Sequence, residues 1–267
     1  MVGTPIGNLG DLSPRAAETL ESVDFIAAED TRVTLKILNH LGIKKPMISY
    51  YEHNRIERGE VICQRIESGE NCAIVTDAGM PCISDPGELL VAQCAERDIK
   101  VVVVPGPSAV ISALAVSGLP TGRFTFEGFL SVNRKSRLDH LESLKDERRT
   151  MIFYEAPHKL ANTLRDLYEA FGDRRISIVR EITKIHEEAI RTTLSEACDK
   201  YGDGGLKGEI VLVLEGKTEE EKELTLEDAV TLAKKLIEEG CSSSDAAKQA
   251  AKATGIKKNE IYREITK

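Results

Sequence analysis

The chain has 267 residues, of which 41% are hydrophobic and 30% charged, a composition typical of a globular protein with one large core or two smaller ones. Its formal net charge of −8 would not attract a polyanion, so any nucleic-acid contact must come from local basic patches. No apolar run is long enough to span a bilayer, and six scattered cysteines without a secretion signal predict a cytoplasmic protein. The cysteines and histidines lack metal-ligand spacing, so we expect no metal site.

Residues 1–117 alternate apolar runs with amphipathic stretches, which is typical of a parallel, doubly wound α/β sheet. Ser13 and Pro14 form a favourable helix start, a cap followed by a first-turn proline. Strands are expected at 23–28, 47–50, 73–75 and 99–104. The pattern predicts a first α/β domain over residues 1–117.

The segment 118–122 (Gly-Leu-Pro-Thr-Gly) has the composition of a linker, and the pattern of elements changes after it. Further strands are expected at 124–129, 151–154, 176–179, 189–193 and 209–214, with helices near 134–147 and 158–171. These elements predict a second α/β domain with a mixed sheet over residues 118–217.

The last segment, 218–267, has a different character. Glu219-Glu220-Glu221 is predicted to be a solvated acidic connector. Three helices are expected after it, near 225–239, 243–253 and 258–266, and Gly255 separates the last two. A short turn with a glycine between two helices predicts a helix-turn-helix.

Three loops rich in glycine and proline follow predicted strands of the first domain, at 3–10, 76–87 and 105–109. The carboxyl ends of parallel strands meet at one edge of a sheet, so the three loops are expected to form a ligand site. Ser108 either caps the next helix or offers its hydroxyl, with the helix amides, to a ligand. No Walker pattern, G-x-S-x-G elbow or G-x-G-x-x-G fingerprint is present, which disfavours a phosphate cradle, a serine hydrolase and a nicotinamide dehydrogenase.

Seven motifs, in chain order, carry a resemblance to a known family. They are Gly3-Thr4-Pro5-Ile6-Gly7-Asn8, Glu29-Asp30-Thr31-Arg32, Thr76-Asp77-Ala78-Gly79-Met80-Pro81, Ser84-Asp85-Pro86-Gly87, Pro105-Gly106-Pro107-Ser108-Ala109, Phe153-Tyr154-Glu155-Ala156-Pro157-His158 and Val179-Arg180-Glu181-Ile182-Thr183-Lys184. Together they resemble the ribosomal RNA small subunit methyltransferase I family, part of the tetrapyrrole-methylase-type class. The resemblance covers residues 2–216, and the closing segment is similar to the helix-turn-helix tail of some members.

The resemblance implies an enzyme that uses S-adenosylmethionine to methylate a cytidine 2′-hydroxyl in 16S ribosomal RNA, releasing S-adenosylhomocysteine. It also implies two α/β domains with the cofactor in the cleft between them, the 30S subunit as partner, and a homodimer. The cofactor contacts that it implies are Pro5, Asp77, Met80, Ile83, Ser108, Ala109, Tyr154 and Arg180.

Methyl transfer to a hydroxyl also requires a group that takes the proton. The candidates expected to face the cleft are Glu29, Asp30, His53, Glu155, Glu181 and Lys184. We expect Lys184 or His53 to take the proton, while Arg32 and Arg180 hold RNA phosphate. In the alternative, these charges only pair with one another, Glu29 with Arg32 and Glu181 with Lys184.

Two local basic patches are candidates for RNA contact. Arg134, Lys135 and Arg137 open a predicted helix and carry three positive charges without an acidic neighbour. Residues 245–267, which include Lys257 and Lys258, hold six basic and three acidic side chains. Phosphate contact would make binding salt-dependent, and a solvated helix face is the alternative in each case.

Two other functions remain open. A methyltransferase of the same architecture could act on another acceptor, such as a tetrapyrrole, although a macrocycle would not need the basic patches. A non-catalytic nucleic-acid-binding regulator would use the helix-turn-helix alone, and S-adenosylhomocysteine would not stabilise such a protein.

Overall fold

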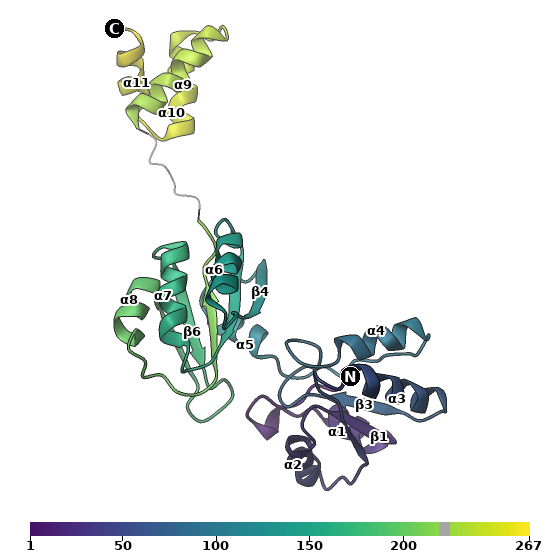
Figure 1. Cartoon of the computed structure of the whole chain (residues 1–267). Coiled ribbons are helices and arrows are strands. Elements are labelled where there is room, and N and C mark those ends of the chain that lie inside the picture. Colours follow the sequence, from purple (N-terminus) through teal and green to yellow (C-terminus); the bar gives the residue numbers. More distant parts are fainter. Residues whose placement is uncertain (219–224) are drawn as a thin grey trace. The chain divides into compact units, whose positions relative to one another are not determined.

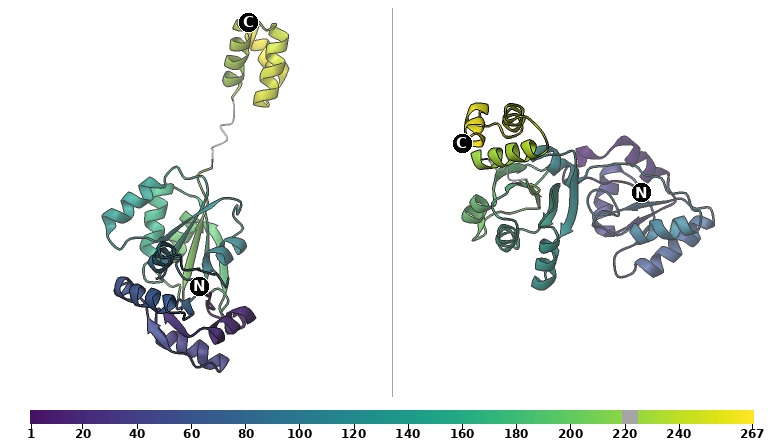
Figure 2. Two further views of the ribbon diagram at one scale, coloured as in Figure 1. Left: turned by 90° about the vertical axis from the view of Figure 1, so that its right-hand side faces the viewer. Right: turned by 90° about the horizontal axis from the view of Figure 1, so that it is seen from above.

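The computed structural model describes residues 1–218 and 225–267, so the predicted acidic connector at 219–221 lies outside the described residues. Two units are present, Met1–Lys217 and Thr218–Lys267. The larger unit contains two sheets and the smaller unit is helical (Figures 1 and 2). None of the described helices combines the length and apolar character that a membrane crossing requires.

The first sheet has three parallel strands in the order β2-β1-β3. Its strands are β1 (Phe25–Ala28), β2 (Met47–Ser49) and β3 (Cys72–Val75), and its helices are α1 (Pro14–Ser22), α2 (Thr31–Leu41), α3 (Arg55–Glu67) and α4 (Glu88–Glu96), with a short 3-10 turn at Leu9–Asp11. Ile26 packs in a cluster with residues of α1 and α2, whereas Phe25 packs with residues of α3 and α4, because successive strand residues point to opposite faces. Helices cover both faces, which confirms the predicted doubly wound sheet.

The predicted strand at 99–104 forms only in part. Val104 makes an isolated parallel bridge with Val2, and the three valines before it are 41–57% exposed. In space, the segment Met1–Gly3 lies between β3 and this run. Its Val2 amide donates a hydrogen bond to the Ile74 carbonyl at 3.0 Å. Within the run 99–104 only Val104 is bridged, so the predicted strand was too long.

The second sheet is mixed, as predicted, with the order β4-β5-β8-β6-β7. Only β4 and β5 are parallel, and the other neighbours are antiparallel. Its strands are β4 (Phe124–Phe129), β5 (Thr150–Glu155), β6 (Arg175–Arg180), β7 (Glu188–Thr193) and β8 (Ile210–Leu214), and its helices are α5 (Ala109–Val116), α6 (Arg134–Ser143), α7 (Leu160–Phe171) and α8 (Leu194–Tyr201). Met151 and Phe153 pack with residues of α6, α7 and α8, while Ile152 packs with α5 on the other face.

The smaller unit contains α9 (Leu226–Glu238), α10 (Ser243–Thr254) and α11 (Lys258–Ile265). Their buried core consists mainly of alanines, together with Ile261. Gly255 ends α10 in the left-handed conformation with a φ of +75°, which glycine adopts without steric cost. Two helices joined by this short turn give the predicted helix-turn-helix arrangement.

Candidate active site

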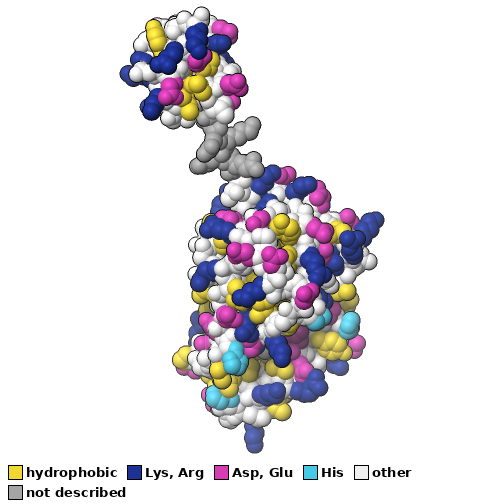
Figure 3. All heavy atoms as spheres, turned by 90° about the vertical axis from the view of Figure 1, so that its left-hand side faces the viewer, with side chains coloured by type: hydrophobic (Ala, Val, Ile, Leu, Met, Phe, Trp, Pro, Cys, Tyr) yellow, Lys and Arg dark blue, Asp and Glu magenta, His cyan; other side chains and the backbone are white. Residues whose placement is uncertain are grey.

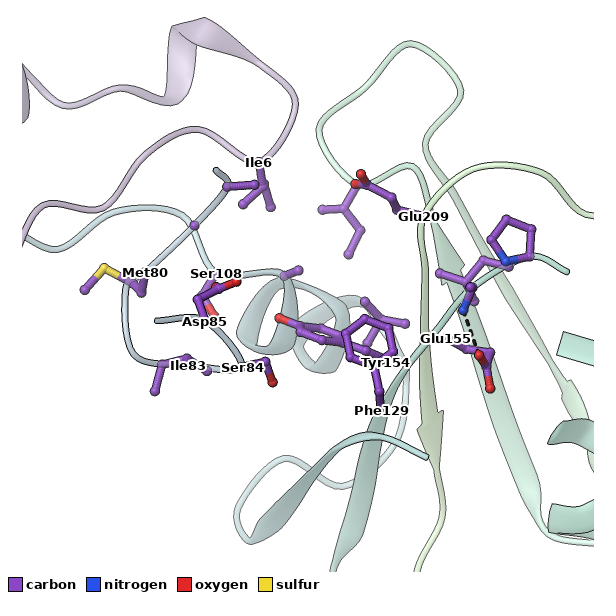
Figure 4. Close-up of a pocket in the computed structure, with 18 residues that line it drawn as sticks. Ile6, Met80, Ile83, Ser84, Asp85, Ser108, Phe129, Tyr154, Glu155 and Glu209 are labelled. Carbon is purple, nitrogen blue, oxygen red and sulfur yellow. Dashed lines mark hydrogen bonds between the residues drawn. The ribbon is translucent and has the colours of Figure 1, made fainter. Parts of the chain in front are cut away.

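The larger unit contains a cavity of about 380 Å³ between loops of its first half and strand ends of its second half (Figure 4). Small-ligand pockets are typically about 300–1,000 Å³. The first half contributes Ile6, Ala78, Gly79, Met80, Ile83, Ser84, Asp85, Ser108 and Ala109 to the wall. The second half contributes Phe129, Tyr154, Glu155, Ala156, Pro157, Ile182, Glu209, Ile210 and Val211. Both halves of the unit therefore build one site.

Main-chain hydrogen bonds join the first two predicted ligand loops. The Thr4 amide donates to the Gly79 carbonyl at 2.9 Å, and the Gly79 amide donates to the Thr4 carbonyl at 3.1 Å. The Thr4 hydroxyl also donates to the Thr76 carbonyl at 3.1 Å. Gly79 has a φ of +87°, a left-handed conformation that favours glycine. These bonds fix the loop after β3 beside the loop that starts at Gly3.

The third predicted loop leads into α5. Ser108 is the N-cap residue, but within the described part of the chain its hydroxyl makes no capping hydrogen bond. Ser108 and Ala109 instead line the cavity. The first amides of α5 have no side-chain cap, and such amides bind anionic groups. The ligand alternative for Ser108 is therefore the one that the geometry favours.

Residues just before β8 complete the far wall. The antiparallel register pairs Glu155 with Ile210 and Tyr154 with Val211, which brings the start of β8 to the carboxyl end of β5. Glu209 then reaches the cavity. The position of Glu209 was not predicted, because the apolar pattern of a strand does not encode its direction in a mixed sheet. Phe129 and Ile182 were missed for the same reason, since each depends on how the second sheet is ordered.

The carboxylates of Glu29, Asp77 and Asp85 lie in the segments that follow β1 and β3. Glu29 accepts a hydrogen bond from the Thr76 hydroxyl at 2.5 Å, and Asp77 accepts one from the Asp30 amide at 3.1 Å. Burial, and then the Glu29 charge, raise the pKa of Asp77. Burial and the Glu29 charge also raise the pKa of Asp85 to about 6, against a lowering by the Thr76 hydroxyl. This edge of the first sheet is therefore electronegative.

Five of the eight expected cofactor contacts line the cavity: Met80, Ile83, Ser108, Ala109 and Tyr154. The other three, Pro5, Asp77 and Arg180, do not. Arg180 is instead paired with Glu188, with Nε 2.8 Å from the carboxylate oxygen, and also donates to the Lys207 carbonyl at 3.1 Å. Of the lining residues that were not expected, Ser84 and Asp85 belong to a motif that the sequence had singled out.

Lys184 lies in an ion-pair group. Its Nζ is 2.9 Å from Oε1 of Glu181 and 3.1 Å from Oε2 of Glu209. Burial lowers the pKa of Lys184, but the two hydrogen bonds outweigh it and raise the pKa overall. The Glu181 pairing is the alternative foreseen for this residue, and it holds the amine protonated, which does not favour Lys184 as a base.

The other candidate bases either do not line the cavity or are held by hydrogen bonds. His53 is exposed and does not line the cavity, and Glu29 is held by Thr76. Hydrogen bonds from the Arg32 side chain and amide lower the pKa of Asp30 to about 2. Glu155 lines the cavity but is 5% exposed and accepts hydrogen bonds from the Ala156 amide, at 2.8 Å, and from the Thr163 hydroxyl.

The expected RNA contacts are divided between free and paired side chains. Arg32 pairs with Asp30, at 2.6 Å, rather than with Glu29, yet its side chain remains 87% exposed. Arg134, Lys135, Lys257 and Lys258 are exposed. Arg137 is paired with Asp166 at 2.6 Å and largely buried, so it is not available to a phosphate. Figure 3 shows one face of the molecule, where basic and acidic side chains are interspersed.

The cavity fits the chemistry of S-adenosylmethionine. Its wall is mainly apolar, with Met80, Ile83 and Tyr154 suited to an adenine ring. Glu209 offers carboxylate oxygens for cationic groups, and the start of α5 offers amides for a carboxylate. Within residues 1–218 and 225–267, no group of His, Cys, Asp and Glu side chains is arranged to hold a metal ion.

Two family models match the sequence. Residues 1–198 match the tetrapyrrole (corrin/porphyrin) methylases, and residues 223–265 match the RsmI C-terminal HTH domain. Solved structures with the same fold include the methyltransferase CobJ, with a TM-score of 0.61, 17% identity and coverage of 80% of this chain and 92% of that chain. Diphthine synthase is another, with a TM-score of 0.58, 12% identity and coverage of 80% and 90%. At these identities the likeness shows the fold alone, and it confirms the predicted two-domain α/β architecture.

Relatives named ribosomal RNA small subunit methyltransferase I are much more similar. The relative from Synechocystis is 46% identical over 98% of this chain and 95% of its own length. The relative from Bacillus subtilis is 43% identical over 98% of this chain and 91% of its own length. The relative from Thermotoga maritima is 50% identical and covers 81% of this chain but 97% of its own length. These values confirm the family resemblance drawn from the motifs.

Proposed function

The chain belongs to the tetrapyrrole (corrin/porphyrin) methylases and, within them, to the ribosomal RNA small subunit methyltransferase I family, and from this we propose that it methylates a cytidine 2′-hydroxyl of 16S ribosomal RNA. The observation that carries the proposal is the cavity, whose apolar walls, carboxylates and uncapped helix start come from both halves of the larger unit. S-Adenosylmethionine, when bound there, supplies an electrophilic methyl group.

The chain's own residues bind and orient the reactants. Met80, Ile83 and Tyr154 would hold the adenine, and the first amides of α5 would bind the amino-acid carboxylate. Glu209 lines the cavity and Asp77 directly precedes the lining residue Ala78, so both carboxylates would attract the cationic end. In-line displacement depends chiefly on positioning, which the fixed loops provide.

We propose that RNA is held by exposed basic side chains at separate places on the surface. Arg32 lies at the start of α2, beside the electronegative end of the first sheet. Arg134 and Lys135 open α6, and Lys257 and Lys258 open α11. Each phosphate that these side chains neutralise would release counterions, so binding should weaken as salt rises. A cytoplasmic homodimer acting on the 30S subunit is part of the same proposal.

The decisive experiment supplies methyl-labelled S-adenosylmethionine to the full-length protein with 30S subunits, and separately with free 16S ribosomal RNA. We expect label in the RNA, at one cytidine, in a form that resists alkaline cleavage because the 2′-oxygen carries the methyl group. Label on a base, or no label in RNA while a tetrapyrrole is methylated, would contradict the proposal and support the alternative acceptor.

Cofactor binding is tested by calorimetry with S-adenosylhomocysteine. Ile83→Ala removes an apolar wall of the cavity, whereas Ile185→Ala changes a side chain that is 97% exposed and lies outside it. We expect weaker binding only for Ile83→Ala, by roughly 1–2 kcal/mol. If both variants bound S-adenosylhomocysteine with equal affinity, the cavity would not be the cofactor site. If the unmodified protein did not bind it, a non-catalytic regulator would be favoured.

A further inference from the structure

Three carboxylates line the cavity, and two of them are committed to other partners. Glu155 is buried and accepts two hydrogen bonds, and Figure 4 shows its side chain turned away from the cavity. Glu209 is paired with Lys184 at 3.1 Å. Within the described residues no lysine, arginine or histidine forms an ion pair with Asp85. Among the described residues, Asp85 is therefore the one of these three carboxylates that is neither paired with a cation, as Glu209 is, nor buried with two hydrogen-bond donors, as Glu155 is.

The groups that face Asp85 come from several elements. Glu29 follows β1, Thr76 and Asp77 follow β3, and Cys82 lies in the same loop as Asp85. Burial of Asp85, then the Glu29 charge, raise its pKa to about 6, while the Thr76 hydroxyl lowers it and the Asp77 charge raises it further. A general base works best when its pKa lies near the working pH.

The loop that carries Asp85 is held in a constrained conformation. Ser84 has a φ of +62° and Cys82 a φ of +74°, both unusual for residues with a side chain. Gly87 has a φ of +139°, and a Cβ there would lie 2.6 Å from the Cys82 sulfur. Such strain persists only where surrounding structure enforces it, and it is often found at functional sites.

Tyr154 stands across the cavity from Asp85, on the second sheet. Figure 4 shows its hydroxyl directed toward the loop with Ser84 and Asp85. Burial, then the Asp85 charge, raise the pKa of Tyr154, which places its hydroxyl within the electrostatic reach of the carboxylate. Phe126 and Phe129 pack against the Tyr154 ring, with centroids 4.9 and 5.3 Å away, and fix its orientation.

We propose that Asp85 is the catalytic base that takes the proton of the acceptor hydroxyl, an inference that rests on the proposed function. Asp85 accepts this proton on a carboxylate oxygen as the O–H bond breaks. The oxygen forms its bond to the methyl carbon, and the carbon–sulfur bond breaks with its electron pair left on sulfur. One O–H and one C–S bond are exchanged for one O–C and one new O–H bond, without an oxidant or reductant.

The test measures methyl transfer to limiting 30S subunits at saturating S-adenosylmethionine, between about pH 5 and 8. The proteins are the unmodified chain, Asp85→Asn, Asp85→Glu, Asp85→Ala and the control Glu88→Gln. Glu88 is exposed in the first turn of α4, so its change removes one carboxylate charge three residues away from Asp85. Calorimetry with S-adenosylhomocysteine gives a second readout that does not depend on turnover.

We expect the methylation rate of the unmodified chain to fall at acid pH with a midpoint at or below about pH 6, a fall called the acid limb. The rate of the Asn variant should be lower by roughly 10²–10⁴-fold and should have no acid limb. Added formate should partly restore Asp85→Ala, Asp85→Glu should keep an acid limb, and Glu88→Gln should match the unmodified chain. S-Adenosylhomocysteine affinity should stay within about threefold throughout, which also shows that the variants fold.

The assignment is overturned if the Asn variant keeps its rate or its acid limb. It is also overturned if the rate and the S-adenosylhomocysteine affinity fall by the same factor, which would make Asp85 a cofactor ligand. An unmodified chain that leaves ribosomal RNA unmethylated would overturn the proposed function itself, and that outcome is visible without any variant.

Discussion

Gly3 and Gly106 lie back to back, with their main chains so close that neither position has room for a side chain. A Cβ on Gly106 would lie 2.8 Å from the Gly3 Cα, and a Cβ on Gly3 would lie 2.7 Å from the Gly106 Cα. The Gly106 amide also donates to the Met80 sulfur at 3.3 Å. This contact brings the first and third loops together beneath the cavity, next to the loop that supplies Met80.

Gly106→Ala should therefore force these two loops apart. The obstacle is main chain, which cannot rotate away, so we expect a loss of roughly 1–3 kcal/mol in the free energy of unfolding. S-Adenosylhomocysteine affinity should fall as well, because Met80 and Ser108 would move. Thermal unfolding and calorimetry measure the two effects. The control is Gly122→Ala, since a Cβ there meets nothing within 4 Å, and equal behaviour of the two variants would disprove the close approach.

Lys184 offers a second test, because its ammonium group forms ion pairs while its aliphatic carbons pack against Gly7. Its amine joins Glu181 to Glu209, and its Cγ would lie 2.6 Å from a Cβ on Gly7. Lys184 thus packs the first loop against the second half of the unit. We expect Lys184→Ala to lower the methylation rate by a similar factor at every pH, whereas loss of a base would remove the acid limb.

His53→Ala accompanies Lys184→Ala in this experiment, because both residues were expected to act as the base. His53 is exposed and outside the cavity, so its variant should keep the unmodified rate. Lys36→Ala, on the exposed part of α2, controls for loss of a lysine. An acid limb that disappears in either Lys184→Ala or His53→Ala would restore that residue as the base and remove Asp85.

The sequence predicted which loops of the first half build the site better than it predicted which residues of the second half reach it. The loops that carry Met80, Ile83 and Ser108 were predicted because they follow expected strands of a parallel sheet, and the family resemblance then implied these residues as cofactor contacts. Glu209 was missed because β8 runs antiparallel to β5, so the residue before a strand, not the one after it, reaches the cavity. Nor does the sequence distinguish a free charge from a paired one, which requires the distances between side chains.

Arg137 and Arg134 illustrate this difference within one helical turn. Arg137 is bound to Asp166, with both side chains less than one-fifth exposed, while Arg134 is exposed. Arg137→Ala would leave Asp166 without its partner and should cost roughly 2–3 kcal/mol of stability. Arg134→Ala should leave stability unchanged but weaken RNA binding and make it less sensitive to salt. Thermal unfolding and filter binding at several salt concentrations separate the two, and a reversed pattern would contradict the assignment.

Asp30 provides a prediction for acid stability. It is the N-cap of α2, and hydrogen bonds from the Arg32 side chain and amide lower its pKa from 3.8 to about 2. A carboxyl with a depressed pKa stabilises the folded state fully above its unfolded pKa, and this contribution disappears as the pH falls through the folded pKa.

Asparagine caps helices as well as aspartate does, so Asp30→Asn changes mainly the charge. We expect the variant to unfold at a lower temperature than the unmodified chain at neutral pH, and the difference to shrink between about pH 4 and pH 2. Asp11→Asn, at an exposed site outside α2, is the control. A difference that stays constant with pH would show that the Asp30–Arg32 pair does not contribute to folding.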